Sequence, residues 1–203
     1  MKYIKMMGLA VVAAMAVMAM AGAGTASANG TACTTNTSPC TSLLANGTKL
    51  SAQLKSGTHA TLTSSLGNVT CKKSTVGGVI NNASTAHGEI TSLTFTECTL
   101  GSTACTVKAT APPYTVTGVA SNQTLTITQK TGGNVPGALV ECGSFINCTF
   151  SNSDITLGFT GGTPAFIKAE AVSLNRSGGF CPSTSTWHAE YEVTSPKTLF
   201  LTV

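Results

Sequence analysis

Segments in which apolar and polar residues alternate run through the chain from about residue 58 to residue 203. The clearest spans residues 186–193, where every second side chain is apolar or aromatic and the others are polar or charged. Strict alternation of this kind is typical of a β-strand with one face in the core and the other in water. The apolar face holds Trp187, Ala189, Tyr191 and Val193.

Turn-forming residues separate these segments, and the chain beyond residue 28 has no apolar stripe with helical periodicity. Gly77-Gly78, Pro112-Pro113 and Gly161-Gly162 are among the expected breaks. Many short strands at this spacing predict an all-β fold, as one antiparallel β-sandwich or barrel-like domain stapled by disulfides. The predicted strands are residues 58–63, 67–72, 76–80, 88–96, 104–110, 113–119, 123–129, 137–142, 147–150, 154–160, 164–174, 185–194 and 198–203.

We expect Trp187 and Tyr191 to anchor the core, because they share the apolar face of the clearest strand. Aromatic residues make up only 5% of the chain, so the core is modest and disulfides are expected to contribute to stability. The other expected core residues are Phe95, Val107, Phe150, Leu157, Phe159, Phe166 and Leu174.

The N-terminus has the pattern of an export signal. Met1-Lys2-Tyr3-Ile4-Lys5 gives a positive start, an apolar run follows to about residue 21, and Ala26-Ser27-Ala28 forms a small-x-small cleavage site. The apolar run is shorter than the ~20 residues of a typical membrane-spanning helix. We therefore expect a signal peptide at residues 1–28, a disulfide-tied N-terminal arm at 29–57 and a single all-β domain at 58–203. The product is expected to be secreted and not to span a membrane.

Eight cysteines in an exported chain predict four disulfides. The stretches 97–106 and 141–149 repeat one pattern, Glu-Cys followed by a short loop and Cys-Thr, which favours a disulfide across the neck of each loop. The chain has no Cys-x-x-Cys, which disfavours a zinc site, and we expect neither a metal nor a cofactor. The preferred pairs, the last of them by elimination, are Cys98–Cys105, Cys142–Cys148, Cys33–Cys40 and Cys71–Cys181.

The charge of the chain limits its partners. Without Lys2 and Lys5 of the expected signal peptide, nine of the eleven basic residues remain against seven acidic residues. Such a nearly neutral chain has little field to hold a polyanion, so nucleic acid is a poor partner. The abundant threonine, serine and asparagine suit a hydrogen-bonding surface, and a cell-wall or cell-surface component is the partner that we consider.

The polar face of the strand at 186–193 carries the strongest candidate for catalysis. His188, Glu190 and Glu192 project to one side of that strand, with side chains two apart separated by about 6.5–7 Å. Two carboxylates can act as acid and base in glycoside hydrolysis, and with His188 they can bind a hard metal. The motif resembles the Glu-x-Asp-x-x-Glu strand of laminarinase-type glycosidases but lacks the Asp and the last Glu, so a solvated outer face is the favoured interpretation.

The remaining polar candidates favour structural roles. Glu97 and Glu141 occupy equivalent places in the two repeated loops, where we expect their carboxylates to accept hydrogen bonds from the backbone of the turn. His59 and His87 have no acidic partner at an informative spacing, and we expect them at the surface or in turns.

Several of these motifs resemble those of a known group of proteins. They are the two Glu-Cys loops closing on Cys-Thr, the step Ala111-Pro112-Pro113-Tyr114, and the late pattern from Phe180-Cys181-Pro182 to Val193. They are similar to motifs in secreted, Thr/Gly-rich, cysteine-stapled β-sandwich proteins of high-GC Gram-positive bacteria. The resemblance covers residues 58–203 and implies the fold and export, but the group has no assigned function to carry over.

Three functions follow as hypotheses. The first is a secreted, non-catalytic structural or binding module of the cell surface or extracellular medium, favoured because nucleophile motifs such as Gly-x-Ser-x-Gly are absent from the sequence. The second is a small-molecule carrier with a cleft between its sheets. The third is a glycoside hydrolase that uses Glu190 and Glu192.

Overall fold

The structure, a computed structural model, describes residues 30–82, 85–133, 135–177 and 181–203, so the expected signal peptide lies outside the described residues. Within these ranges no helix is long and apolar enough to cross a membrane. The strands of the described chain are β1 (Thr31–Cys33), β2 (Thr48–Leu54), β3 (Ala60–Ser64), β4 (Gly67–Asn81), β5 (His87–Leu100), β6 (Thr103–Ala109), β7 (Tyr114–Val119), β8 (Thr124–Gln129), β9 (Gly137–Cys142), β10 (Ile146–Ser151), β11 (Asp154–Thr160), β12 (Phe166–Ser177), β13 (Thr184–Ser195) and β14 (Phe200–Thr202).

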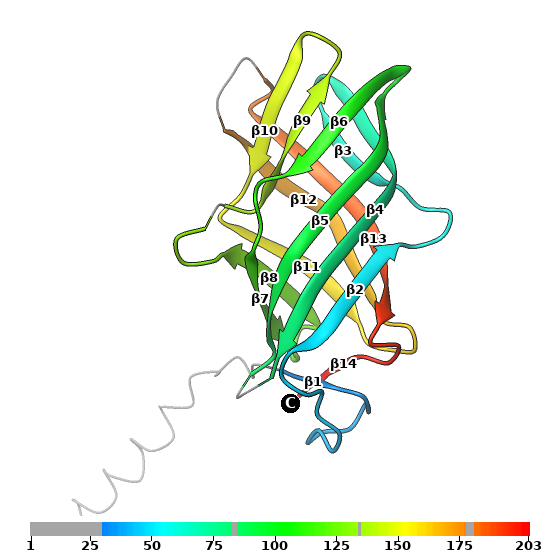
Figure 1. Cartoon of the computed structure of the whole chain (residues 1–203), viewed down its shortest axis with the longest axis vertical. Helices are drawn as coiled ribbons and strands as arrows, with labels where there is room; N and C mark the ends of the chain where they lie inside the picture. Colours follow the sequence, from blue (N-terminus) through cyan, green and yellow to red (C-terminus); the bar gives the residue numbers. More distant parts are fainter. Residues whose placement is uncertain (1–29, 83–84, 134, 178–180) are drawn as a thin grey trace, which may run out of the picture.

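Twelve of these strands form one antiparallel sheet that closes on itself as a cylinder (Figure 1). The long strands β4, β5, β12 and β13 run through its whole length, with β4 paired to β5 and β12 paired to β13. β2, β7, β8 and β11 complete a lower ring of eight strands with them, and β3, β6, β9 and β10 complete an upper ring. The all-β prediction is confirmed, and the barrel-like alternative describes the closed sheet.

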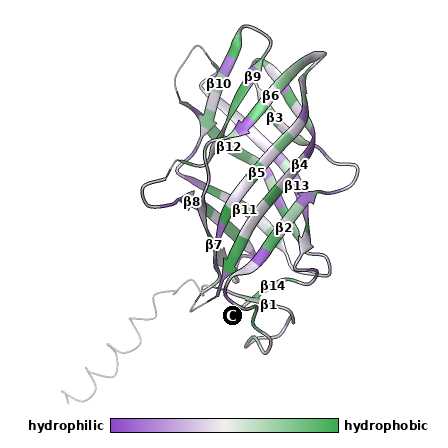
Figure 2. Cartoon of the chain, viewed as in Figure 1, coloured by the Kyte–Doolittle hydropathy of each residue, from purple (hydrophilic) through white to green (hydrophobic). Residues whose placement is uncertain are grey.

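Hydrophobic and hydrophilic residues are interspersed along the strands (Figure 2), and the buried residues are mostly apolar. Trp187, Phe95 and Val107 are partly buried and pack against the core, as expected. Because successive side chains of a strand point to opposite faces, the register of each strand decides which residues reach the interior. The expected core residues that are buried are Phe150, Leu157, Phe159, Leu174 and Tyr191.

Phe166 was expected in the core, and this prediction is wrong. Its neighbour Ile167 is buried, so Phe166 faces outward at the start of β12, opposite Glu192 of β13. The Lys55 ammonium lies 5.1 Å from the centre of its ring, in a cation–π contact on the outer surface. Alternation over the few residues after Pro164 was too short to fix the register of this strand.

Gly77-Gly78 was expected to be a break between two strands, but both glycines lie inside β4 at a shift in its register with β5. A Cβ on Gly78 would lie 2.3 Å from the Glu89 carbonyl oxygen, and one on Gly77 would lie 2.5 Å from the Ser92 hydroxyl. Glycine is needed here because the backbones of β4 and β5 approach closely, not because the chain turns.

The lower end of the cylinder is closed by the short sheet of β1 and β14 (Figure 1). The buried Leu201 side chain fills the space beside Gly118, where a Cβ would lie 2.7 Å from its Cδ1 atom. The Asn82 amide donates to the Ala32 carbonyl at 2.7 Å and accepts from the Ala32 N–H at 3.0 Å. Gln123 Nε2 donates to the Leu201 carbonyl at 2.9 Å. These bonds hold both ends of the described chain across the lower opening.

The region expected as an N-terminal arm, residues 29–57, contributes to both sheets. β1 belongs to the closing sheet, and the Cys33–Cys40 disulfide ties the loop that follows it. β2 lies in the cylinder itself, between β13 and β4. The described part of this region is therefore continuous with the β-structure that follows it.

The disulfides confirm only one of the preferred pairs. Cys33–Cys40 forms as expected, whereas Cys98–Cys105, Cys142–Cys148 and Cys71–Cys181 are wrong. Each of the other three disulfides joins cysteines 27 to 37 positions apart. In the chain-entropy account, each of these disulfides stabilises the fold by about 3.5 kcal/mol. The observed pairs of the cylinder are Cys71–Cys98, Cys105–Cys142 and Cys148–Cys181.

The strand register explains why the pairing between loop neighbours fails. Cys71, Cys98, Cys105 and Cys142 lie in one row across β4, β5, β6 and β9, each opposite the next. A bond between the middle two would leave the outer two roughly 14 Å apart, since neighbouring strands lie about 4.8 Å from each other. Only the pairs Cys71–Cys98 and Cys105–Cys142 allow all four cysteines of the row to form disulfides. Cys98 does face Cys105 across a hairpin, as the repeat predicted, but each bonds to its other neighbour.

We predict that Gly78→Ala lowers the free energy of unfolding by about 1–3 kcal/mol, because the new methyl group collides with the Glu89 carbonyl. Urea denaturation followed by circular dichroism measures the change. Gly158→Ala is the matched control in another strand, where the added Cβ has its nearest contact at 3.7 Å and should change stability little. Equal losses in the two variants would contradict the close approach of β4 and β5.

Candidate binding cavity

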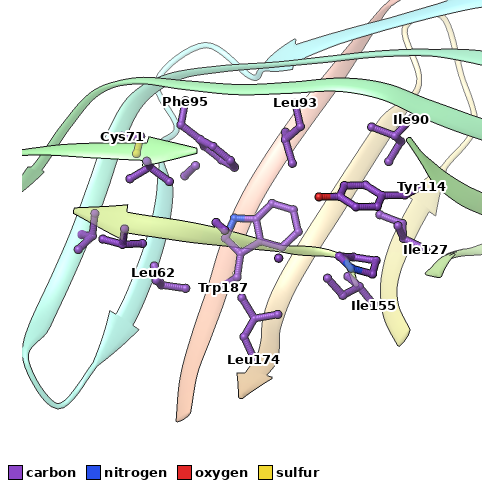
Figure 3. Close-up of a pocket in the computed structure, with 17 residues that line it drawn as sticks. Leu62, Cys71, Ile90, Leu93, Phe95, Tyr114, Ile127, Ile155, Leu174 and Trp187 are labelled. Atoms are coloured by element: carbon purple, nitrogen blue, oxygen red, sulfur yellow. The ribbon is translucent and has the colours of Figure 1, made fainter. Parts of the chain in front are cut away.

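A cavity of about 70 Å³ lies inside the cylinder where the upper and lower rings meet. Residues from ten strands, β3 to β9 and β11 to β13, and from the loop before β9 surround it. Figure 3 shows the Trp187 ring among them, with Leu174 on one side and Phe95 and Leu93 on the other. We call this space the central cavity. Its lining is Ala60, Leu62, Val69, Cys71, Ile90, Leu93, Phe95, Val107, Tyr114, Ile127, Pro136, Gly137, Ala138, Val140, Ile155, Leu174 and Trp187.

A β-bulge in β12 directs part of this lining inward. Between Ala169 and Val172 the register with β13 shifts by one residue, and Ala171 adopts a φ of 53°. The extra residue returns Leu174 to the interior; without it, that position would face solvent. His188, on the outer side of β13, accepts a hydrogen bond at its Nδ1 atom from the Ala171 N–H at 3.3 Å. This candidate for catalysis thus contacts the backbone irregularity that shapes the cavity.

The polar groups of the tyrosines near the cavity are paired within the protein. The Tyr191 hydroxyl lies 2.9 Å from the buried Ser74 hydroxyl, and the Tyr191 ring packs edge-on against Trp187 at 6.4 Å. The Tyr114 hydroxyl lies 3.0 Å from the Thr110 hydroxyl. Burial raises the pKa of both Tyr191 and Tyr114, so both stay neutral. These pairs leave an apolar surface toward the cavity.

The composition of the lining restricts what the central cavity can hold. Every residue in it is uncharged, and nearly all of its exposed surface belongs to apolar atoms. An apolar cavity of about 150 Å³ in another protein stays dry and binds benzene or xenon. The central cavity has about half that volume, so it fits a small or slender apolar group.

A second cavity of about 70 Å³ lies in the lower ring. Phe159 and Ile167 line it from the sheet, and Leu201 lines it from β14. Its wall also includes His87 and Glu89, so it is less uniformly apolar than the central cavity. The closing sheet of β1 and β14 covers this side of the interior.

The candidates for glycoside hydrolysis lie on the outer face of β13, and none of them lines either cavity. Glu190 forms an ion pair with Lys55 at 2.8 Å, and the same lysine lies over Phe166. Glu192 stands opposite Gln53 on β2, on the same outer face. The structure therefore brings the carboxylates together along one strand, as predicted, without an aromatic-walled cavity around them.

Glu97 and Glu141 pair with lysines on neighbouring strands, and not with the turn backbone as expected. Glu97 forms an ion pair with Lys73, and the Glu141 carboxylate lies 3.2 Å from the Lys108 ammonium. The hydrogen bond and charge of Lys73 lower the pKa of Glu97 below its ordinary value, with a smaller contribution from the charge of Lys72. These contacts place both carboxylates in cross-strand ion pairs on the surface.

The other predicted site residues are dispersed. His59 is exposed in the loop between β2 and β3, and His87 is exposed at the start of β5, where its Nδ1 atom lies 3.3 Å from the Thr117 hydroxyl. All eight cysteines are in disulfides. Among the described residues, no group of three or more His, Cys, Asp or Glu side chains is placed to hold a metal ion.

No protein-family model, curated protein or solved structure matches the chain. The all-β fold with four disulfides agrees with the general architecture of the secreted proteins that the motifs resemble. Such a number of disulfides is typical of proteins that fold in an oxidising, extracellular environment.

Sequence reasoning missed the central cavity as a site. It identified Trp187, Phe95 and Leu174 as core residues, but Leu62, Leu93 and Tyr114 come from strands whose neighbours in space were unknown. The available signal was the low aromatic content, because few large side chains fill the interior of an eight-stranded ring. The volume of the cavity depends on how side chains from different strands pack together, which the alternation within one strand does not specify.

We predict that Lys73→Ala raises the pKa of Glu97 toward its ordinary value, because the main contact that favours the carboxylate is lost. Since the folded-state pKa is lowered, the ion pair stabilises the fold above the unfolded-state pKa and loses this effect as the pH falls. NMR titration of the Glu97 side chain measures the shift. Lys72→Ala is the matched control and should move this pKa less; an equal or larger shift would contradict the assigned pairing.

Proposed function

We propose that the protein is a secreted, non-catalytic binding module that holds a small apolar molecule in the central cavity. The observation that carries the proposal is the uncharged, apolar lining around Trp187, in a cavity enclosed by a closed sheet. Eight-stranded closed sheets in other proteins can hold one small ligand in their interior. The proposal joins the binding-module and small-molecule-carrier hypotheses.

The expected export of the chain supports an extracellular place of action. The signal-peptide pattern at residues 1–28 and the four disulfides both favour secretion. The motifs that resemble secreted proteins of high-GC Gram-positive bacteria favour a bacterial origin. An extracellular binder of this kind acts in the medium or at the cell surface.

The outer surface supports a non-catalytic role. Five of the seven acidic residues form ion pairs with lysines, with 3.2 Å or less between the lysine nitrogen and a carboxylate oxygen. One of the five is Glu190 of the hydrolase hypothesis. Exposed pairs of this kind contribute little stability, but they cancel local fields that would attract a polyanion. We therefore place recognition inside the cylinder and not on its charged residues.

We predict that xenon or 1-propanol changes the fluorescence of Trp187 in the mature protein. Trp187 is the one tryptophan of the chain and lines the cavity, so its emission reports on the site directly. Ala138→Leu should fill the cavity from β9 and weaken binding at least tenfold. The titration is read as an emission change against ligand concentration, with circular dichroism confirming that the variant is folded.

The double variant Glu190→Gln, Glu192→Gln is the control, because both positions lie on the outer face of the strand that carries Trp187. It should bind both probes like the native protein. Unchanged emission with both probes, or equal binding to the Ala138→Leu variant, would contradict the proposed site. Loss of binding in the control would place the ligand on the outer face.

A further inference from the structure

The upper ring contains a row of four cysteines in which each of the two inner cysteines has two neighbours. Cys71, Cys98, Cys105 and Cys142 lie directly opposite one another on β4, β5, β6 and β9. Side chains of directly opposite residues project to the same face of a sheet, with Cβ atoms about 4.5–5.5 Å apart. Cys98 and Cys105 therefore each have one cysteine to which they are bonded and a second one within reach.

The unbonded neighbours Cys98 and Cys105 have the same relative position as the bonded pairs. The Cys71–Cys98 and Cys105–Cys142 disulfides join opposite residues whose Cα atoms are 3.9 and 4.2 Å apart. Cys98 and Cys105 are also opposite residues, across the hairpin of β5 and β6. A disulfide between them therefore needs no change in the register of the strands.

The cysteines of the row differ in their exposure. Cys105 is partly buried. Cys71, Cys98 and Cys142 are only 3%, 5% and 2% exposed, and Cys71 lines the central cavity (Figure 3). A reductant in solution therefore meets Cys105 first, and it reaches Cys71 only through the other cysteines.

We propose that the row is a thiol–disulfide relay, which transfers reducing equivalents from a small dithiol at Cys105 to Cys71 in the wall of the central cavity. First, one thiolate of the dithiol attacks the Cys105 sulfur, and Cys142 leaves as a thiolate that takes up a proton. The second thiolate of the dithiol then displaces the Cys105 thiolate, and the dithiol leaves as a cyclic disulfide. The protein has gained two electrons, and the dithiol has lost two.

The next step takes place within the row. The Cys105 thiolate attacks the Cys98 sulfur, a Cys98–Cys105 bond forms, and Cys71 leaves as a thiolate that takes up the second proton. Displacement at sulfur needs the attacking, central and leaving sulfurs in line, and the order of Cys105, Cys98 and Cys71 across β6, β5 and β4 favours this arrangement. The Cys71 thiol suits the apolar wall of the cavity, because a thiol behaves as a small hydrophobic group.

The product of the relay has a Cys98–Cys105 disulfide and two thiols at the ends of the row. Cys71 and Cys142 lie roughly 14 Å apart, since neighbouring strands are about 4.8 Å from each other. They cannot bond to each other, so reoxidation has to return through the row. The relay is a redox activity beyond the proposed binding function, and it places a reactive group in the wall of the same cavity.

Limited reduction of the mature protein with one equivalent of dithiothreitol tests the relay. Samples taken over time are quenched with acid, unfolded, labelled with N-ethylmaleimide and mapped as tryptic peptides by mass spectrometry. We expect the peptide of residues 74–108 to gain an internal Cys98–Cys105 bond. Cys71 and Cys142 should carry the label in the same samples. If no Cys98–Cys105 bond forms at any time, whichever cysteines carry the label, the relay is overturned.

A pair of double variants tests the entry at Cys105. Cys105→Ser, Cys142→Ser should slow the release of the Cys71 thiol about tenfold or more, because dithiothreitol must then attack a buried disulfide. Cys148→Ser, Cys181→Ser removes a disulfide outside the row and should release this thiol at the native rate. Circular dichroism confirms that both variants are folded. Release at the native rate in the first variant, or equal slowing in both, would contradict the entry at Cys105.

Discussion

The pairing of β4 with β5 is the constraint on which the rest of the structure depends. Both rings contain these two strands, and they are joined along almost their whole length. The Cys71–Cys98 bond fixes the register at the upper part, and Gly78 allows close approach at the lower part. If this pair separated, both rings would open and every side chain of the interior would lose one wall. The fold is therefore closed by a covalent bond and a backbone contact in the same hairpin.

The interior that this closure creates explains the proposed site. An eight-stranded ring has room for its own side chains or for one small ligand. Here the chain supplies few aromatic residues, and glycine, alanine and valine face inward at many positions. Trp187 and Tyr114 therefore form walls without filling the space between them. The disulfides hold the ring closed with a smaller core than packing alone would need.

Much of the fold could be predicted from the sequence, because alternation is a local property that survives in the closed sheet. The strand at 186–193 has the predicted faces, with Tyr191 inside and Glu190 outside. The errors come from information that lies between strands. Gly78 looked like a turn residue, but glycine is needed there because the Glu89 carbonyl of another strand lies close to it. Cys98 bonds to Cys71 although Cys105 also faces it. The cavity depends on such neighbours even more strongly, since ten strands contribute to it.

The most direct test of the central claim is a crystal structure of the mature protein under xenon pressure. Xenon occupies apolar cavities and needs no polar partner. The account predicts a xenon peak in the central cavity, beside Trp187, Phe95 and Leu174, with the surrounding strands unmoved. Side chains or ordered water that fill this space, with no xenon peak in the interior, would contradict it.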